Sequence, residues 1–269
     1  MLKGTLVSYF LATGGYGVHM LWLKPKLRLV SPLILSLGLL MHTGALITRW
    51  LEAGYPPITN FQESLSFFAW ILVGLTLVVH VSSRIVVLGA FVSPIAFLMS
   101  LSSIALDSQA AELPPVLNSY WLAVHVTFAF LGNAVLTLAF SVSLAYLLQE
   151  YFVKMKKKLF LFKRLPSLEA LDGLNQTFLG WGFPIMTLGI LSGGIWARIH
   201  WGEWWFWEWR QMLSACTWLF YALLLHGRLS MGWRGKKAAL WTIAGFSVLM
   251  ISYLVVNLAL PGRHAGRFG

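Results

Sequence analysis

The sequence contains little charge and almost no cysteine. Of its 269 residues, 9 are acidic and 20 are Lys or Arg, so charged residues make up 11% of the chain, well below the share in soluble domains. The single cysteine, Cys216, lies within an apolar run. One thiol excludes an internal disulfide, a CxxC redox pair and a CxxCH motif. The chain therefore supplies no thiol pair for redox or thioether chemistry.

Long apolar runs take the place of charge. Hydrophobic residues make up 58% of the chain, and its mean hydropathy is +0.73. About eight runs are long enough to cross a hydrocarbon layer of ~30 Å: Thr5 to Leu23, Ser31 to Thr48, Ser64 to Ser82, Ile85 to Ser102, Trp121 to Leu148, Phe178 to Arg198, Met212 to Leu229 and Ala238 to Leu260. We therefore expect an all-α polytopic membrane protein with about eight transmembrane helices, in which residues 1–269 form a single integral membrane domain. The first run lacks a clear basic start and a cleavage site, so we do not expect a cleaved signal peptide.

Basic residues concentrate in alternate connections between these runs. The net charge of +11 could indicate nucleic acid, but in a polytopic protein Lys and Arg first report topology, and we expect no nucleic-acid partner. Fourteen of the twenty basic residues lie in every second connection: Lys24, Lys26, Arg28, Arg84, Lys154, Lys156, Lys157, Lys158, Lys163, Arg164, Arg228, Arg234, Lys236 and Lys237. The positive-inside rule places these connections in the cytoplasm and both termini outside. The longest of them, "EYFVKMKKKLFLFKRLPSLEALDG", is typical of a helix on the membrane surface.

One short stretch is crowded with indoles. The segment "WGEWWFWEWR", residues 201–210, holds five tryptophans in ten positions, on the predicted outer side. An aromatic belt is one explanation, because indoles favour the membrane interface. However, belts collect tryptophans from many helix ends, whereas these follow one another in sequence beside Glu203, Glu208 and Arg210. A surface for a flat, apolar, partly charged ligand explains that pattern better.

Histidines indicate which ligand this is. Neutral imidazole is the usual protein ligand of haem iron, and ionisable residues in membrane spans are costly. Three histidines lie at the predicted outer level: His125, His200 and His264. His42 lies deeper, in the outer half of the second span, and the remaining three lie near inner ends of spans: His19, His80 and His226. Two outer histidines on different helices would suit bis-axial haem ligation beside the indoles. Each one alone is more often a packed or interfacial residue.

Several ordered motifs give the chain a family resemblance. "GILSGGIWARIHWGEWWFWEW" resembles the WWD signature of haem-handling membrane proteins, with WGxxWxW matched at Trp201, Gly202, Trp205 and Trp207. The segments "PPITNFQESLSFFAW", "YWLAVHVTFAFLGNAVLTLAF", "WLFYALLLHGR", "MGWRGKKAALWTIAGF" and "YLVVNLALPGRH" are similar to the CcsA/ResC type of the System II cytochrome c biogenesis pathway. The resemblance extends from about Arg49 to His264.

This resemblance implies a function. The family receives haem and presents it on the outer face for covalent attachment to the CxxCH motifs of apocytochrome c, together with a CcsB/ResB-like partner. It implies non-covalent haem b in this chain, which has no CxxCH. It also implies a bacterial plasma (inner) membrane location with the site facing the periplasm or the cell exterior. The chain would be part of a haem lyase only together with that partner, which leaves its own standing as an enzyme open.

The resemblance also implies ligands. Carried over by position, His125 and His264 would be the axial pair that flanks a WWD loop of about residues 198–211. His226 would belong to an inner haem site, and His19, His80 or the partner protein would complete its ligation.

The loop departs from the family pattern after its WGxxWxW motif. An acidic, Pro, Lys, Glu run is replaced by Glu208, Trp209, Arg210 and Gln211, so Glu208 keeps the negative charge and Arg210 keeps a cation. Four arginines lie where haem propionates could need a cation, although each could simply snorkel to the membrane edge: Arg49, Arg198, Arg210 and Arg263. Asn60 and Glu63 either cap a helix or shape the outer site.

Two other functions fit the pattern of spans. A HemX-like regulator of haem synthesis would share the spans but would not need a WWD loop between two histidines. A b-type electron-transfer subunit would place paired histidines deep in the membrane.

Overall fold

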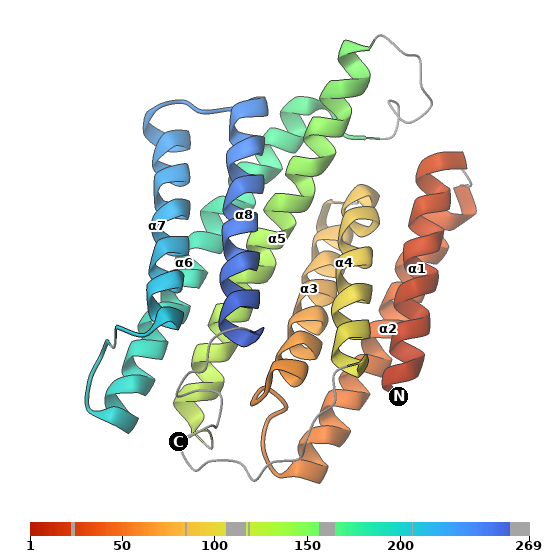
Figure 1. Cartoon of the computed structure of the whole chain (residues 1–269). Helices are drawn as coiled ribbons and strands as arrows, with labels where there is room; N and C mark the ends of the chain where they lie inside the picture. Colours follow the sequence, from red (N-terminus) through yellow and green to blue (C-terminus); the bar gives the residue numbers. More distant parts are fainter. Residues whose placement is uncertain are drawn as a thin grey trace.

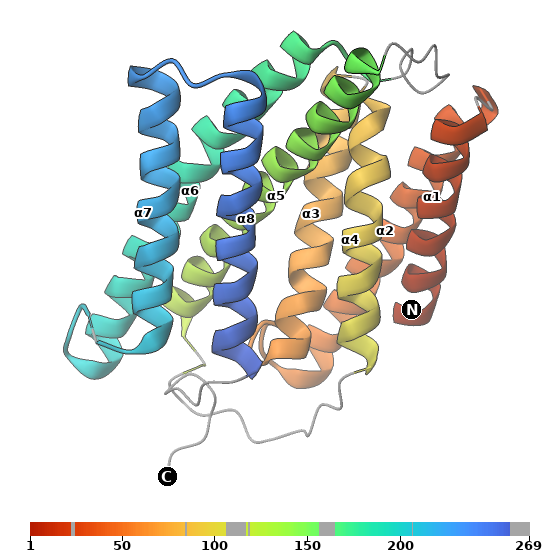
Figure 2. The same ribbon diagram turned by 45° about the horizontal axis from the view of Figure 1, so that its top comes forward.

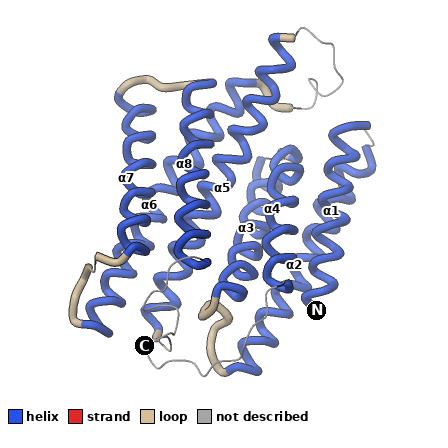
Figure 3. Tube along the Cα trace, viewed as in Figure 1, coloured by secondary structure: helices blue, strands red, loops and turns tan. Residues whose placement is uncertain are grey.

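The chain folds into a bundle of long helices. The computed structural model describes residues 1–22, 25–83, 85–105, 117, 119–155, 165–205 and 207–258, and throughout these ranges the regular secondary structure is helical (Figure 3). The helices are α1 (Leu2–Trp22), α2 (Pro25–Ala53), α3 (Phe61–Ser83), α4 (Val86–Ala105), α5 (Tyr120–Lys154), α6 (Leu168–Trp201), α7 (Trp209–Ser230) and α8 (Gly235–Leu258). The expected all-α class is confirmed, and the described residues contain eight helices at the places of the eight predicted runs.

Seven of the described helices, α2 to α8, are long and apolar enough to span a membrane. The polytopic membrane protein expected from the sequence is therefore confirmed. Helix α1 falls short because glycines and polar side chains dilute its apolar residues. Its buried face includes Thr5, Ser8, Tyr9 and Tyr16, and it packs against α2 and α4.

Helix α5 joins two halves of the bundle. It packs against α6 and α8 on one side and against α3 and α4 on the other. Helices α1 and α7 lie at opposite edges (Figures 1 and 2). The N-terminus, the α2–α3 connection, the start of α5 and the α6–α7 connection lie together at one end, drawn at the bottom of Figure 1. The α7–α8 connection lies at the other end, with the exposed basic residues Arg234, Lys236 and Lys237 at or just before the start of α8.

Several helices continue beyond the apolar runs that predicted them. Helix α5 reaches Lys154, and α6 begins at Leu168, ten residues before the expected start. The expected surface helix therefore needs correction at its described ends, because residues 150–154 belong to α5 and residues 168–173 to α6. Residues 156–164 lie outside the described part of the chain. Hydropathy identifies only the apolar part of a helix, the part that crosses the bilayer. The helix itself continues beyond that part where its polar side chains find hydrogen-bond or ion-pair partners.

Glycines bring α5 and α6 into close contact. A Cβ atom on Gly132 would lie 2.6 Å from the backbone nitrogen of Met186, and one on Gly189 would lie 2.9 Å from the backbone of Ala129. Small residues let helix backbones approach closely in a membrane, where packing rather than hydrophobic burial drives association. This close contact brings side chains of α5 against the backbone of α6.

Candidate functional site

His125 is oriented by a backbone carbonyl across the α5–α6 contact. Its Nδ1 lies 2.7 Å from the carbonyl oxygen of Gly189. A carbonyl oxygen can only accept, so Nδ1 carries the proton and donates it. The neutral ring then keeps its lone pair on Nε2, and a carbonyl held in this way fixes the ring orientation of many metal-bound histidines. His125 therefore has the tautomer that an iron ligand needs.

An aromatic row lies beside His125. The indole of Trp196 is 1% exposed and lies parallel to the imidazole, with ring centroids 6.4 Å apart and an interplanar angle of 7°. Trp201 packs edge-on against Trp196 with centroids 4.9 Å apart. Space for the imidazole comes from Gly193, because a Cβ there would lie 2.7 Å from the His125 ring. The row connects the imidazole to the first tryptophan of the WGxxWxW motif.

The remaining indoles are displayed on the surface. Gly202 ends α6 at φ +80°, a left-handed conformation that glycine adopts without strain, and its N–H donates to the Arg198 carbonyl. A short connection then leads to α7, which begins at Trp209. Trp204, Trp205, Trp207 and Trp209 are 58%, 37%, 84% and 62% exposed. Exposed indoles gathered in one loop suit a flat apolar ligand, the chemistry expected from the sequence.

A cation lies next to this loop. Arg210, in the first turn of α7, is half-buried and lies within electrostatic range of His125, Glu208 and Tyr253. Its Nε has no hydrogen-bond partner among the described residues. Tyr253 of α8 packs against Phe130 of α5, with ring centroids 6.3 Å apart. Arg210 therefore places a positive charge in the first turn of α7, within electrostatic range of the predicted iron ligand His125.

The residue predicted to be the second axial ligand is His264. His264 lies outside the described residues, so its relation to His125 stays a prediction. His200 is half-buried in the last turn of α6, and its ring contacts Trp196 edge-on at 5.8 Å. Its Nε2 has no hydrogen-bond partner within the described part of the chain. The described residues thus fit one axial position and the aromatic surroundings of a haem.

His42 has a structural role instead. Its side chain is buried, its Nδ1 pairs with the hydroxyl of Tyr9 at 3.1 Å, and its Nε2 pairs with the hydroxyl of Ser66 at 2.8 Å. Both ring nitrogens are therefore used in joining α1, α2 and α3. This histidine is a satisfied core residue, and nothing in its geometry leaves a nitrogen for a ligand.

The start of α3 is a cap tied to α2. Asn60 accepts a hydrogen bond from the backbone N–H of Glu63, and the Glu63 carboxylate accepts from both the N–H and the hydroxyl of Thr59. Arg49 pairs with the same carboxylate at 2.9 Å and contacts Tyr55. Of the two sequence interpretations, the cap is therefore present, and Arg49 is engaged by a protein carboxylate.

The histidines at the other end do not form a cluster. His226 is exposed near the end of α7, and its Nδ1 lies 3.4 Å from the Ser230 hydroxyl. Helix α7 packs against α6 and α8, whereas His80 is on α3 and His19 is on α1. Across the described residues, no group of three or more His, Cys, Asp or Glu side chains could hold a metal ion. Among the described residues, the predicted inner site therefore has one exposed candidate ligand and no second histidine beside it.

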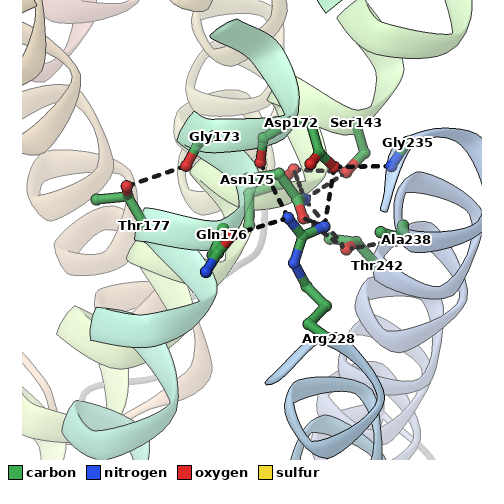
Figure 4. A network of polar contacts seen from close by, with 11 residues as sticks. Ser143, Asp172, Gly173, Asn175, Gln176, Thr177, Arg228, Gly235, Ala238 and Thr242 are labelled. Carbon is green, nitrogen blue, oxygen red and sulfur yellow. Dashed lines mark hydrogen bonds and ion pairs between the residues drawn. The ribbon is translucent and has the colours of Figure 1, made fainter. Parts of the chain in front are cut away.

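A buried polar network that the sequence did not predict lies at that end. The sequence predicts Arg228 in a basic cytoplasmic connection, but its side chain is 1% exposed. Figure 4 shows it inserted between α6 and α8, where it pairs with Asp172 at 3.0 Å and donates to the Asn175 side chain at 3.1 Å. Arg228 is therefore a structural residue rather than a solvated topology signal.

The network joins all four C-terminal helices. Asn175 donates to the hydroxyls of Ser143 on α5 and Thr242 on α8. Asp172 accepts from Arg228 on α7 and from the backbone N–H of Gly235 at the start of α8. The feature of the sequence that could have indicated this network is the pair Asp172 and Asn175, which lie one helical turn apart just before an apolar run. Such groups inside a helical bundle must find partners.

Comparison with known proteins agrees with the family resemblance of the sequence. Residues 58–264 match the family model described as "Cytochrome C assembly protein". Relatives named "Cytochrome c biogenesis protein CcsA" include one from Guillardia theta, 35% identical over 81% of this chain and 79% of the relative. Another, from Chlorella vulgaris, is 36% identical over 83% and 81%. One from Synechocystis is 30% identical over 93% and 91%. The chain therefore belongs to the cytochrome c assembly protein family.

Proposed function

We propose that this protein receives haem and presents it, non-covalently bound as haem b, at the end of the bundle that carries Trp201 to Trp209, for attachment to apocytochrome c. Membership of the cytochrome c assembly protein family gives the chain a role in cytochrome c maturation. Haem is here the cargo, and the chain acts as one integral membrane domain.

The observation that carries the proposal is the tautomer of His125. Its Nδ1–H is committed to the Gly189 carbonyl, so Nε2 is the nitrogen left to ligate iron. The exposed indoles of Trp205 and Trp207 supply apolar surface for the porphyrin at the same end. In this proposal His264 supplies the other axial ligand, and Glu208 adjusts the charge of the loop.

The site faces the periplasm or cell exterior of a bacterial plasma membrane. This orientation is supported by the distribution of charge, because exposed Arg234, Lys236 and Lys237 lie at the end of the bundle opposite to the tryptophan loop. Both termini then lie outside. Reporter fusions at Gly235 and after Arg198 test the orientation, and a cytoplasmic reporter signal after Arg198 would reverse it.

A CcsB/ResB-like membrane protein is the partner in this proposal. Thioether formation needs reduced apocytochrome thiols, haem vinyl groups and a positioned iron, and this chain contributes the positioning. It therefore acts as part of a haem lyase together with the partner. At the cytoplasmic end, exposed His226 first receives haem, and a residue of the partner completes the ligation, because the described helices bring no second histidine beside it.

Family membership favours this function over the two alternatives. A regulator of haem synthesis has no use for the exposed tryptophans of the loop. A b-type electron-transfer subunit would need paired histidines within the membrane, and His42, the deeply buried candidate, has both nitrogens occupied by Tyr9 and Ser66.

Reconstituted maturation tests the proposal. The protein is produced with a CcsB/ResB-like partner and a CxxCH-bearing apocytochrome in cells without another maturation system, and covalent haem on the cytochrome is measured. We expect attachment that depends on this chain and disappears when the two CxxCH cysteines are replaced by Ala. The purified protein should give a b-type pyridine haemochrome spectrum. Absence of attachment together with no haem uptake, even from excess haem, would contradict the function.

A further inference from the structure

We infer that Arg210 pairs with a propionate carboxylate of the bound haem and makes the site selective for a porphyrin with free carboxylates. This inference rests on the proposed function, since it names a further contact between the same site and its cargo. Neither the family match nor the names of the relatives assign a role to this residue.

The first support is an unused donor in a partly desolvated place. Arg210 is half-buried, and its Nε has no hydrogen-bond partner among the residues that the structure describes. A guanidinium has five N–H donors in a fixed plane and gains most from a carboxylate that accepts two of them. A donor withdrawn from water without an acceptor is costly. An incoming carboxylate removes that cost.

The second support is position. Arg210 lies within electrostatic range of His125, whose Nε2 would hold the iron. It also follows directly after Trp209, the last of the exposed indoles. A porphyrin bound through its iron and packed on indoles carries its two propionates at one edge, so a cation adjacent to the indoles and within electrostatic range of the iron ligand can meet that edge. Tyr253 of α8 also lies within electrostatic range of the guanidinium.

The negative charge of Glu208 does not prevent Arg210 from binding a propionate. Glu208 lies within electrostatic range of Arg210 and offsets part of its charge. Because a guanidinium has more than one donor edge, Glu208 and a propionate can share it. The shared arrangement also explains why an arginine suits this loop, since the single ammonium group of lysine has no planar fork.

The other described arginines at this end are less suited. Arg49 is committed to the Glu63 carboxylate at 2.9 Å. Arg198 is exposed on α6, where water competes for its charge, so a contact there would contribute little. Arg198 is therefore a matched control, because it carries the same charge at the same end of the bundle.

The test compares haem with haem dimethyl ester, in which both propionates are esterified. Dissociation constants of both ligands are measured in detergent for the purified wild-type protein, Arg210→Gln and Arg198→Gln. We expect Arg210→Gln to weaken haem binding about tenfold and to leave ester binding within twofold of wild type. Arg198→Gln should change neither. Comparing each variant with wild type cancels the different partitioning of the two ligands into detergent.

The possible outcomes separate this inference from the proposed function. If Arg210→Gln leaves haem binding unchanged, or weakens haem and ester equally, the propionate contact is refuted while haem presentation still stands. If wild type binds neither ligand, the proposed function fails instead. Should Arg210→Gln not insert into the membrane, Arg210→Lys replaces it. For Arg210→Lys, a partial loss of affinity for haem with unchanged affinity for the dimethyl ester supports the propionate contact. An equal loss of affinity for both ligands overturns it.

Discussion

The Nδ1 of His125 lies 2.7 Å from the carbonyl oxygen of Gly189, and this one contact determines which nitrogen of the imidazole is available. It joins α5 to α6 at the point where glycines let the two helices approach. The same close packing that stabilises the bundle therefore orients the proposed iron ligand, so changes in the packing should appear in the haem spectrum.

Substitutions at two adjacent glycines test whether the orientation of the His125 ring determines haem binding. A Cβ on Gly193 would lie 2.7 Å from the His125 ring, whereas one on Gly194 would make only ordinary contacts with Trp204, the nearest at 3.5 Å. We expect Gly193→Ala to displace the imidazole, weaken haem binding roughly tenfold and alter the Soret band. Gly194→Ala should bind haem like wild type. Equal spectra and affinities for both variants would mean that His125 does not ligate the iron.

Stability should respond to the α5–α6 contact independently of haem. A Cβ on Gly132 would lie 2.6 Å from the Met186 backbone nitrogen, which cannot move like a flexible side chain, while one on Gly180 would meet nothing within 4 Å. We expect Gly132→Ala to lower the free energy of unfolding by about 1–3 kcal/mol through overpacking. Gly180→Ala should be neutral or slightly stabilising. Thermal unfolding in detergent without haem measures both, and a neutral Gly132→Ala would refute the close contact.

Much of the fold follows from the sequence, because a bilayer imposes simple rules. Apolar runs predicted all eight described helices, although α1 falls short of a membrane span, and alternating basic connections predicted which helix ends lie together. The start of α6 could not be predicted this way, since Asp172 and Asn175 make its first turns polar, and residues up to 173 were expected in a helix on the membrane surface instead of in the span. Their partners Arg228 and Thr242 are 53 to 67 residues away, and only the packed bundle brings them together.

The site was predictable in part for similar reasons. His125 and the tryptophan motif were identified from the sequence, but the tautomer of His125 depends on Gly189, 64 residues further along the chain. His42 was left without a role because Tyr9 and Ser66, which bind its two nitrogens, lie on other helices. Depth along a span is readable from sequence, whereas the direction in which a side chain points depends on its neighbours.

The polar network at the opposite end should be a major contributor to stability. Arg228 is 1% exposed, so Arg228→Ala removes the cation that pairs with Asp172 and donates to Asn175. We expect a loss of about 3 kcal/mol in unfolding free energy, typical of breaking a buried ion pair from one side. Arg234→Ala removes the same charge from an exposed position and should cost less than about 0.5 kcal/mol. Similar unfolding temperatures for the two variants would contradict the structural role of Arg228.

The proposed inner haem site rests on His226. This side chain is exposed, so His226→Ala should leave folding intact. If haem is first received there, the variant should carry several-fold less haem after production in cells and should mature less cytochrome. Purified apoprotein loaded with haem at the outer site should behave like wild type. Unchanged haem content and maturation in cells would remove the inner site from the account.

Replacement of His125 tests the central claim most directly. The measurement is the absorption spectrum and covalent cytochrome yield of His125→Ala with and without added imidazole, with Thr127→Ala, an exposed position on the same helix, as the control. If His125 ligates the presented haem, His125→Ala should lose outer-site haem or open one axial position, and maturation should fail although the protein inserts. Imidazole should then restore part of both, because it can occupy the vacated ligand position. A wild-type spectrum, normal maturation and no response to imidazole would contradict haem presentation through His125.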